Sequence, residues 1–256
     1  MLDQVVASAE VTEHQDEHHP TRNGAHQSSL PSQAKIQAAQ DRRYVGHFRS
    51  SVVPLLAVWG FGTLVLGASA AHGKVDQLFL DPAYVNGGAW WTGLVSQLGV
   101  LGWTIAVVSA AWAAWIARHT GRSSAARFLG RGALASLVLL TDDLFGVHSM
   151  FWVLGPLGKP FGLALVLSPV AAWLWFFRTD ILRTRWMLLA GAFLGNALSI
   201  LGDTLGQGSI SDQAVLFEDG PKFLGILAWA TYFIASTYDI ARSALRSAIH
   251  GDHLDR

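Results

Sequence analysis

The sequence predicts an all-α integral membrane protein: a polytopic helical bundle of about six transmembrane helices with both termini in the cytoplasm. The chain of 256 residues is 51% hydrophobic and only 14% charged, whereas soluble domains carry about 25% charged residues. Between residues 51 and 240 it divides into apolar runs that are long enough to cross a bilayer. The Arg residues fall in the connections between alternate runs, which gives the bundle an orientation.

Composition excludes several classes of function. The chain has no Cys, which excludes disulfides, zinc–thiolate sites, iron–sulfur clusters and thiol nucleophiles. Lys and Arg balance Asp and Glu at 18 each, so no net field favours nucleic acid. The sequence also contains no glycine-rich phosphate-binding loop, and we therefore expect no nucleotide.

Three regions differ in composition. Residues 1–45 are acidic and rich in Ser, Gln and His, and we expect them to form a disordered cytoplasmic tail. The tail begins without an apolar core, so it does not resemble a cleavable signal peptide. Residues 46–242 form the predicted membrane domain, and residues 243–256 form a short cytoplasmic C-terminal tail.

Each predicted span is a continuous apolar run, and an unbroken run of about 20 residues favours a membrane helix. Pro169 interrupts the fourth and shortest run, but proline can kink a membrane helix without ending it. The predicted spans are Ser51–Ala71, Trp90–Ala117, Ala133–Leu154, Phe161–Phe177, Trp186–Gly206 and Lys222–Ile240.

The cationic residues orient these spans. Arg residues precede the first span, join the second to the third and the fourth to the fifth, and follow the sixth. The other connections carry only Lys74, Lys159 and Lys222. Because basic residues favour the cytoplasmic side, we expect a multi-pass protein of the cell membrane with membrane lipids as its surroundings.

Two adjacent carboxylates lie about halfway along the predicted third span. Asp142 and Asp143 follow an apolar segment, and His148 comes one to two turns later, so that Asp143 and His148 flank the face of Asp142 in a wide polar arc. A charged residue at the centre of a membrane helix costs about 2.5–3.5 kcal/mol on insertion scales. Two in tandem therefore indicate a polar cavity within the bundle.

The fifth span carries small residues at every fourth position, ending in an acid. Gly191, Gly195 and Ser199 precede Asp203 at this spacing, which lets another helix approach closely. We expect the Gly191/Gly195 face to serve helix packing, in a homo-oligomer or in a larger membrane complex. Asp203 is a candidate site residue.

The sixth span opens with a charged segment. Pro221 suits the first position of a helix, and Glu218 and Asp219 suit its positive end. Lys222 is a cation where the helix dipole opposes one, so it requires anions. It can pair locally with Glu218 or Asp219, or across the bundle with an acid of another span.

These side chains lie at similar depth in the outer half of the predicted bundle. Carboxylates and one His, without thiols, favour a hard or borderline divalent metal ion whose identity the sequence leaves open. We expect Asp142, Asp143 and Lys222 to act in catalysis. The predicted metal ligands are Asp142, Asp143, His148, Asp203, Glu218 and Asp219.

The leading hypothesis from the sequence is a metal-dependent membrane enzyme that acts on a lipid or an apolar small molecule. A proton- or cation-coupled transporter is a second hypothesis, because buried carboxylates and a Lys can exchange protons. The inner halves of the spans carry almost no ionisable residue, which favours the enzyme. An accessory subunit of a membrane complex is the third hypothesis.

Overall fold

A computed structural model describes residues 33–73, 75–79, 92–205 and 212–251. Within these ranges every regular element is a helix. The helices are α1 (Gln33–His72), α2 (Val75–Phe79), α3 (Leu94–His119), α4 (Ser123–Phe145), the 3-10 helix η2 (Val147–Leu157), α5 (Gly158–Phe176), α6 (Arg178–Leu182), α7 (Trp186–Leu205) and α8 (Asp212–Gly251).

Among the described residues, five segments are long and apolar enough to cross a membrane. They are Ser51–His72, Leu94–His119, Val153–Phe176, Trp186–Thr204 and Gln213–Leu245. The predicted all-helical fold is therefore confirmed for the described residues, and the five long apolar segments support a multi-pass membrane protein. Helix α4 is not in this set, since it carries two Arg and two Asp residues within its 23 residues.

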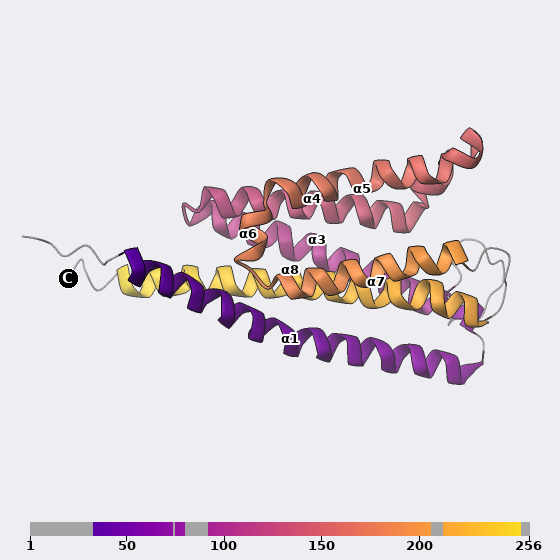
Figure 1. Ribbon diagram of the computed structural model, residues 1–256, viewed down its shortest axis with the longest axis horizontal. Coiled ribbons are helices and arrows are strands. Elements are labelled where there is room, and N and C mark those ends of the chain that lie inside the picture. Colours follow the sequence, from indigo (N-terminus) through magenta and orange to yellow (C-terminus); the bar gives the residue numbers. More distant parts are fainter. Residues whose placement is uncertain (1–32, 74, 80–91, 206–211, 252–256) are drawn as a thin grey trace, which may run out of the picture.

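The long helices run side by side along one axis (Figure 1). Helices α3 and α4 form a hairpin around a tight turn at Thr120–Arg122, and α5 packs on α4 and η2. On the other side α7 packs along α8, and α1 contacts both of them. The start of α1 and the end of α8 lie at the same end of the bundle (Figure 1).

Aromatic and small side chains fill the core. Trp173 packs against Trp229 and Phe233 at ring-centroid distances of 5.8 and 5.9 Å. Its indole N–H donates to the carbonyl of Phe128 at 3.0 Å. Buried alanines on α3 let α4 and α8 approach closely, and these packed elements build the wall of the site described below.

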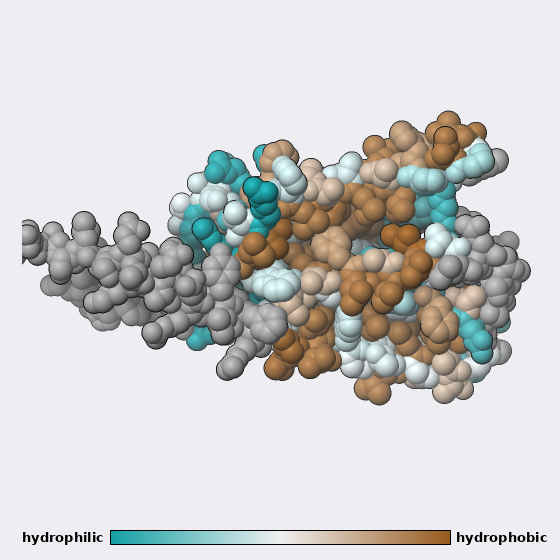
Figure 2. Space-filling model, in the orientation of Figure 1, coloured by the Kyte–Doolittle hydropathy of each residue, from teal (hydrophilic) through white to brown (hydrophobic). Residues whose placement is uncertain are grey.

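The outer surface of the helices is largely apolar. Leu64, Val108, Trp175 and Phe176 are examples, each more than half exposed. Figure 2 shows hydrophobic residues over the middle of the molecule and hydrophilic residues towards both ends. Such a surface suits hydrocarbon rather than water, because large apolar patches are rare on soluble monomers.

The predicted third span, Ala133–Leu154, is wrong in its bounds. Helix α4 ends at Phe145, where Gly146 takes a left-handed conformation with φ 59°, and a 3-10 helix follows. Apolar residues continue across this break, so the hydropathy pattern does not reveal it. The correction places Asp142 and Asp143 in the last turn of α4, rather than midway along a span.

The predicted start of the sixth span is also wrong. Helix α8 begins at Asp212, so Pro221 and Lys222 lie inside the helix and not in its first turn.

At the N-terminal side, α1 begins at Gln33, within the range 1–45 that we expected to be disordered. Its first residues, Gln33–Gln40, are rich in good helix formers. Residues 1–32 lie outside the described residues. Helix α8 continues into the predicted C-terminal tail as far as Gly251.

The small residues of α7 pack within the same chain. A Cβ atom on Gly195 would lie 2.5 Å from the carbonyl oxygen of Pro221 and 2.7 Å from the amide nitrogen of Gly225 on α8. A Cβ on Gly191 would meet Leu55 of α1 at 2.6 Å. The Gly191/Gly195 face is therefore covered by α1 and α8, which corrects the expectation that it is open to a second copy.

Candidate functional site

A cavity of about 490 Å³ lies between the α4–α5 pair and the α7–α8 pair. Its wall includes all seven side chains singled out in the sequence: Asp142, Asp143, His148, Asp203, Glu218, Asp219 and Lys222. They come from the last turn of α4, from η2, from the end of α7 and from the first half of α8. The fold thus brings together residues from distant parts of the sequence.

The cavity has a charged end and an apolar end. The charged side chains all lie where α4 and α7 end and α5 begins. The hydrophilic recess visible in Figure 2, near the end remote from the C-terminus, corresponds to this part of the molecule. Along α5 the wall continues with Leu163, Val166, Val170 and Leu174. A ligand that fills the cavity therefore meets charge at one end and hydrocarbon at the other.

Asp142 and His148 form a close carboxylate–imidazole pair. Nδ1 of His148 lies 2.9 Å from both carboxylate oxygens of Asp142, and the backbone N–H of His148 donates to Oδ1 at 2.8 Å. The tight connection at Gly146 brings the two residues together, because it turns η2 back towards the last turn of α4. The contact at Nδ1 leaves Nε2 as the second ring position for proton exchange.

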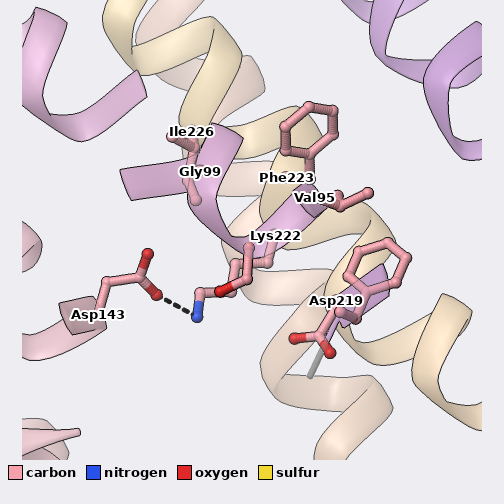
Figure 3. A pocket seen from close by; sticks show the side chains of 9 residues that line it. Val95, Gly99, Asp143, Asp219, Lys222, Phe223 and Ile226 are labelled. Atoms are coloured by element: carbon pink, nitrogen blue, oxygen red, sulfur yellow. Dashed lines mark ion pairs between the residues drawn. The ribbon is translucent and has the colours of Figure 1, made fainter. Parts of the chain in front are cut away.

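Asp143 forms an ion pair with Lys222 across the bundle. The Asp143 side chain is 10% exposed and the Lys222 side chain is 39% exposed. The interaction joins the end of α4 to the interior of α8 (Figure 3). Of the two pairings that the sequence left open for Lys222, the structure has the one across the bundle.

Asp203 contacts a lysine that the sequence analysis did not place in the site. Nζ of Lys159 donates to Oδ2 of Asp203 at 2.5 Å, which links the first turn of α5 to the last turn of α7. Both side chains are partly exposed and line the cavity. The available signal was an isolated lysine next to a long apolar run on the side that lacks Arg.

Glu218 and Asp219 are the two remaining carboxylates of the cavity. Neither has a hydrogen bond or ion pair to another side chain within the described ranges. The wall thus contains five carboxylates, two lysines and one histidine. The carboxyl groups at this end of the cavity outnumber the basic groups, which favours a ligand group that donates hydrogen bonds.

The predicted metal site is not supported by the arrangement. Within the part of the chain that the structure describes, no group of three or more His, Asp and Glu side chains could hold a metal ion. Three of the five carboxylates instead have a basic partner, in Lys222, Lys159 and His148. These three basic side chains pair with carboxylates that a metal ion would otherwise have to bind. A bound divalent ion stays a prediction that elemental analysis of the purified protein tests.

Two tryptophan side chains form part of the cavity wall. Trp103 and Trp229 line it and pack edge to face at a centroid distance of 5.8 Å. The indole N–H of Trp229 donates to Oγ of buried Ser136 at 2.9 Å, which fixes the ring in place.

Comparison with known proteins gives a family for the chain. No curated protein and no solved structure matches it. The family described as a domain of unknown function, DUF8692, matches residues 52–236. This range includes every ionisable residue of the cavity and covers more than half of the chain. The protein therefore belongs to the DUF8692 family.

Proposed function

We propose that this protein is a membrane enzyme that binds a lipid or an apolar small molecule in the cavity and acts on the polar end of that molecule. The observation that carries the proposal is the amphipathic cavity itself. Its apolar wall along α5 suits a hydrocarbon chain, and the charged residues gather at one end. Its volume of about 490 Å³ lies within the range of small-molecule sites, which is about 300–1,000 Å³.

The pair of Asp142 and His148 is the best candidate for acid–base chemistry. A carboxylate at Nδ1 fixes the orientation of the imidazole, so that Nε2 can exchange a proton with a substrate. His148 lines the cavity at its charged end, where a polar headgroup would lie. In this proposal Asp142 is a positioning residue and His148 is the catalytic residue.

Asp143, Lys222 and the carboxylates of α8 bind the polar end of the substrate. Their carboxyl oxygens accept hydrogen bonds, which favours a headgroup that carries an amine or several hydroxyl donors. The ion pair of Asp143 with Lys222 holds α4 and α8 at the spacing that the cavity requires.

A transporter agrees less well with the geometry. Alternating access requires polar groups that extend towards both sides of the membrane. Here the ionisable residues of the cavity gather at one end, and its wall continues along α5 with the apolar side chains of Leu163, Val166, Val170 and Leu174. The enzyme hypothesis requires access from one side only.

We further propose the predicted topology, with six spans and the Arg-rich end in the cytoplasm. Helix α4 is the span of these six that is not among the five long apolar segments given above. Its 23 residues extend about 35 Å at 1.5 Å per residue, which is enough for a hydrocarbon core of about 30 Å. The Arg residues of α4 lie near its start and the acids near its end, and α3 shields one side of it. The cavity then opens towards the outer leaflet.

The test separates binding from catalysis with two variants. Val170 is buried in the cavity wall, so Val170→Phe should block binding; Val108→Phe, at an exposed position on α3, is the matched control. His148→Gln should bind the substrate but not convert it. Each protein is purified in mild detergent, and molecules that copurify are identified by mass spectrometry before and after incubation with a total lipid extract.

We expect wild type and Val108→Phe to bind and convert the same lipid. Val170→Phe should lose the bound lipid, and His148→Gln should retain it while conversion falls by about 100-fold or more. Equal copurification with Val170→Phe and Val108→Phe would show that the cavity is not the binding site. If the wild type binds a lipid but does not convert it, the enzyme is refuted and an accessory subunit is favoured.

A further inference from the structure

A second, smaller pocket adjoins the ion pair of Asp143 and Lys222. It has a volume of about 40 Å³ and lies between α2, α3, α4 and α8. Asp143, Asp219 and Lys222 line both this pocket and the large cavity. The remaining wall is Phe79, Val95, Ser96, Gly99, Phe223 and Ile226. The ion pair therefore lies between the small pocket and the large cavity. Figure 3 shows it among the residues that line the small pocket.

The small pocket meets the physical requirements of a water site. A water molecule needs about 10–15 Å³ of such volume and two to four polar partners, so this pocket has room for about three. In Figure 3 the Lys222 side chain lies between Asp143, which it contacts, and Asp219. The hydroxyl of Ser96 adds a fourth polar group to the wall.

The polar groups of this wall have unused hydrogen-bonding capacity. An ammonium group has three N–H donors, and Asp143 is the acid with which Lys222 pairs. Asp219 and Ser96 have no side-chain hydrogen bond to another residue in the described ranges. In a low-dielectric surrounding an unsatisfied polar group is destabilising, and bridging waters satisfy it.

We propose that the small pocket binds a cluster of a few water molecules that hydrates the Asp143–Lys222 pair and reaches the large cavity through Asp219. Water on this side remains in place when an amphiphile fills the large cavity. The pair can therefore exchange protons along a route that the substrate does not block. This last role rests on the proposed function, whereas the water site itself does not.

The absence of Cys makes a direct test possible. Ser96→Cys places a single thiol in the pocket wall, and Ala110→Cys places one in the fully buried core of the same helix. Ag⁺ is close to water in size and reacts with the thiolate form of Cys. That form is favoured where water hydrates the sulfur and disfavoured in an apolar surrounding. The purified variants are exposed to Ag⁺, then unfolded, and the remaining thiol is counted with a fluorescent maleimide.

We expect the thiol of Ser96→Cys to react at least about tenfold faster than that of Ala110→Cys. Adding Gly99→Ala should slow it, because the new Cβ lies 3.3 Å from Cδ1 of Ile226 and 3.9 Å from Oδ2 of Asp143 and fills part of the pocket. Gly60→Ala is the control, since a Cβ there meets no atom within 4 Å. Equal rates in Ser96→Cys and Ala110→Cys would overturn the water site.

A third variant separates the two compartments. Val170→Phe reduces the large cavity at a position that does not line the small pocket. The thiol of Ser96→Cys should react at an unchanged rate in this background. A rate that falls to the Ala110→Cys level would show that water reaches the pocket only through the large cavity, which refutes the separate route. Neither outcome depends on whether the cavity binds a lipid.

Discussion

Lys222 lies on α8 close to Glu218 and Asp219, yet its ammonium pairs with Asp143 on α4. The pairing across the bundle neutralises an acid that is 10% exposed and that has Asp142 as its chain neighbour. Without the lysine, Asp143 would face two further carboxylates of the cavity wall. Without the aspartate, Lys222 would still have acids of its own helix nearby. Loss of Lys222 should therefore be more destabilising than loss of Asp143.

This asymmetry gives a prediction for stability. Lys222→Met should lower the free energy of unfolding by about 3 kcal/mol, the lower end for a broken buried pair, because Lys222 is 39% exposed. Asp143→Asn should cost less, since Glu218 and Asp219 remain near the ammonium. The double variant should recover part of the loss. Reversible unfolding in mixed micelles measures all three, and strictly additive effects would contradict the ion pair.

At the scale of the element, η2 positions the histidine of the site. The segment is held from two sides, by the hydrogen bonds of His148 to Asp142 and by close packing against α5 at Gly162. A Cβ on Gly162 would collide with the carbonyl oxygen of His148 and lie 2.8 Å from Cδ2 of Phe151. The absent side chain at Gly162 thus allows η2 to approach α5.

Gly162→Ala should therefore displace His148 and weaken its contact with Asp142. We expect a loss of about 1–3 kcal/mol in unfolding free energy, which is typical of an added methyl group in a tightly packed contact. The imidazole NMR signals of His148 should also shift. Gly130→Ala on α4 is the control, because its new Cβ would lie 3.9 Å from Cβ of Ala114, an ordinary contact. Equal stability of the two variants would argue against this role of Gly162.

The two ends of the bundle differ in their charged residues and in how their connecting segments are held to α8. At the Arg-rich end, Arg185 donates to both carboxylate oxygens of Asp239 at 3.1 and 3.2 Å, and Arg122 donates to Ser243. These contacts tie the connections of the bundle to α8. At the other end the α4–α5 and α7–α8 pairs enclose the cavity.

The topology with α4 as a membrane span can be tested with single cysteines in this Cys-free chain. Ser124, at the start of α4, and Met150, in η2 just beyond the end of α4, are both exposed. A membrane-impermeant thiol reagent should label Met150→Cys on intact cells, whereas Ser124→Cys should require permeabilised membranes. Labelling of both residues from outside would exclude α4 as a span. Labelling of Ser124→Cys alone would reverse the orientation.

Hydropathy and the positions of the ionisable residues were enough to predict long apolar helices and the polar side chains that interrupt them. Long apolar runs have few alternatives to helices in a bilayer, because every backbone group must find its partner within the segment. For the same reason, ionisable residues that interrupt such runs stand out, and the seven predicted residues all line the cavity.

The ion pairs of the site and the shape of the cavity depend on how the helices pack, which hydropathy and periodicity do not specify. The end of α4 depends on one left-handed glycine at Gly146, and hydropathy does not register a change in backbone angle. The contacts of Lys222 with Asp143 and of Lys159 with Asp203 join residues far apart in the sequence. Periodicity places a side chain on a face of its own helix, but the packing of helices against one another selects its partner.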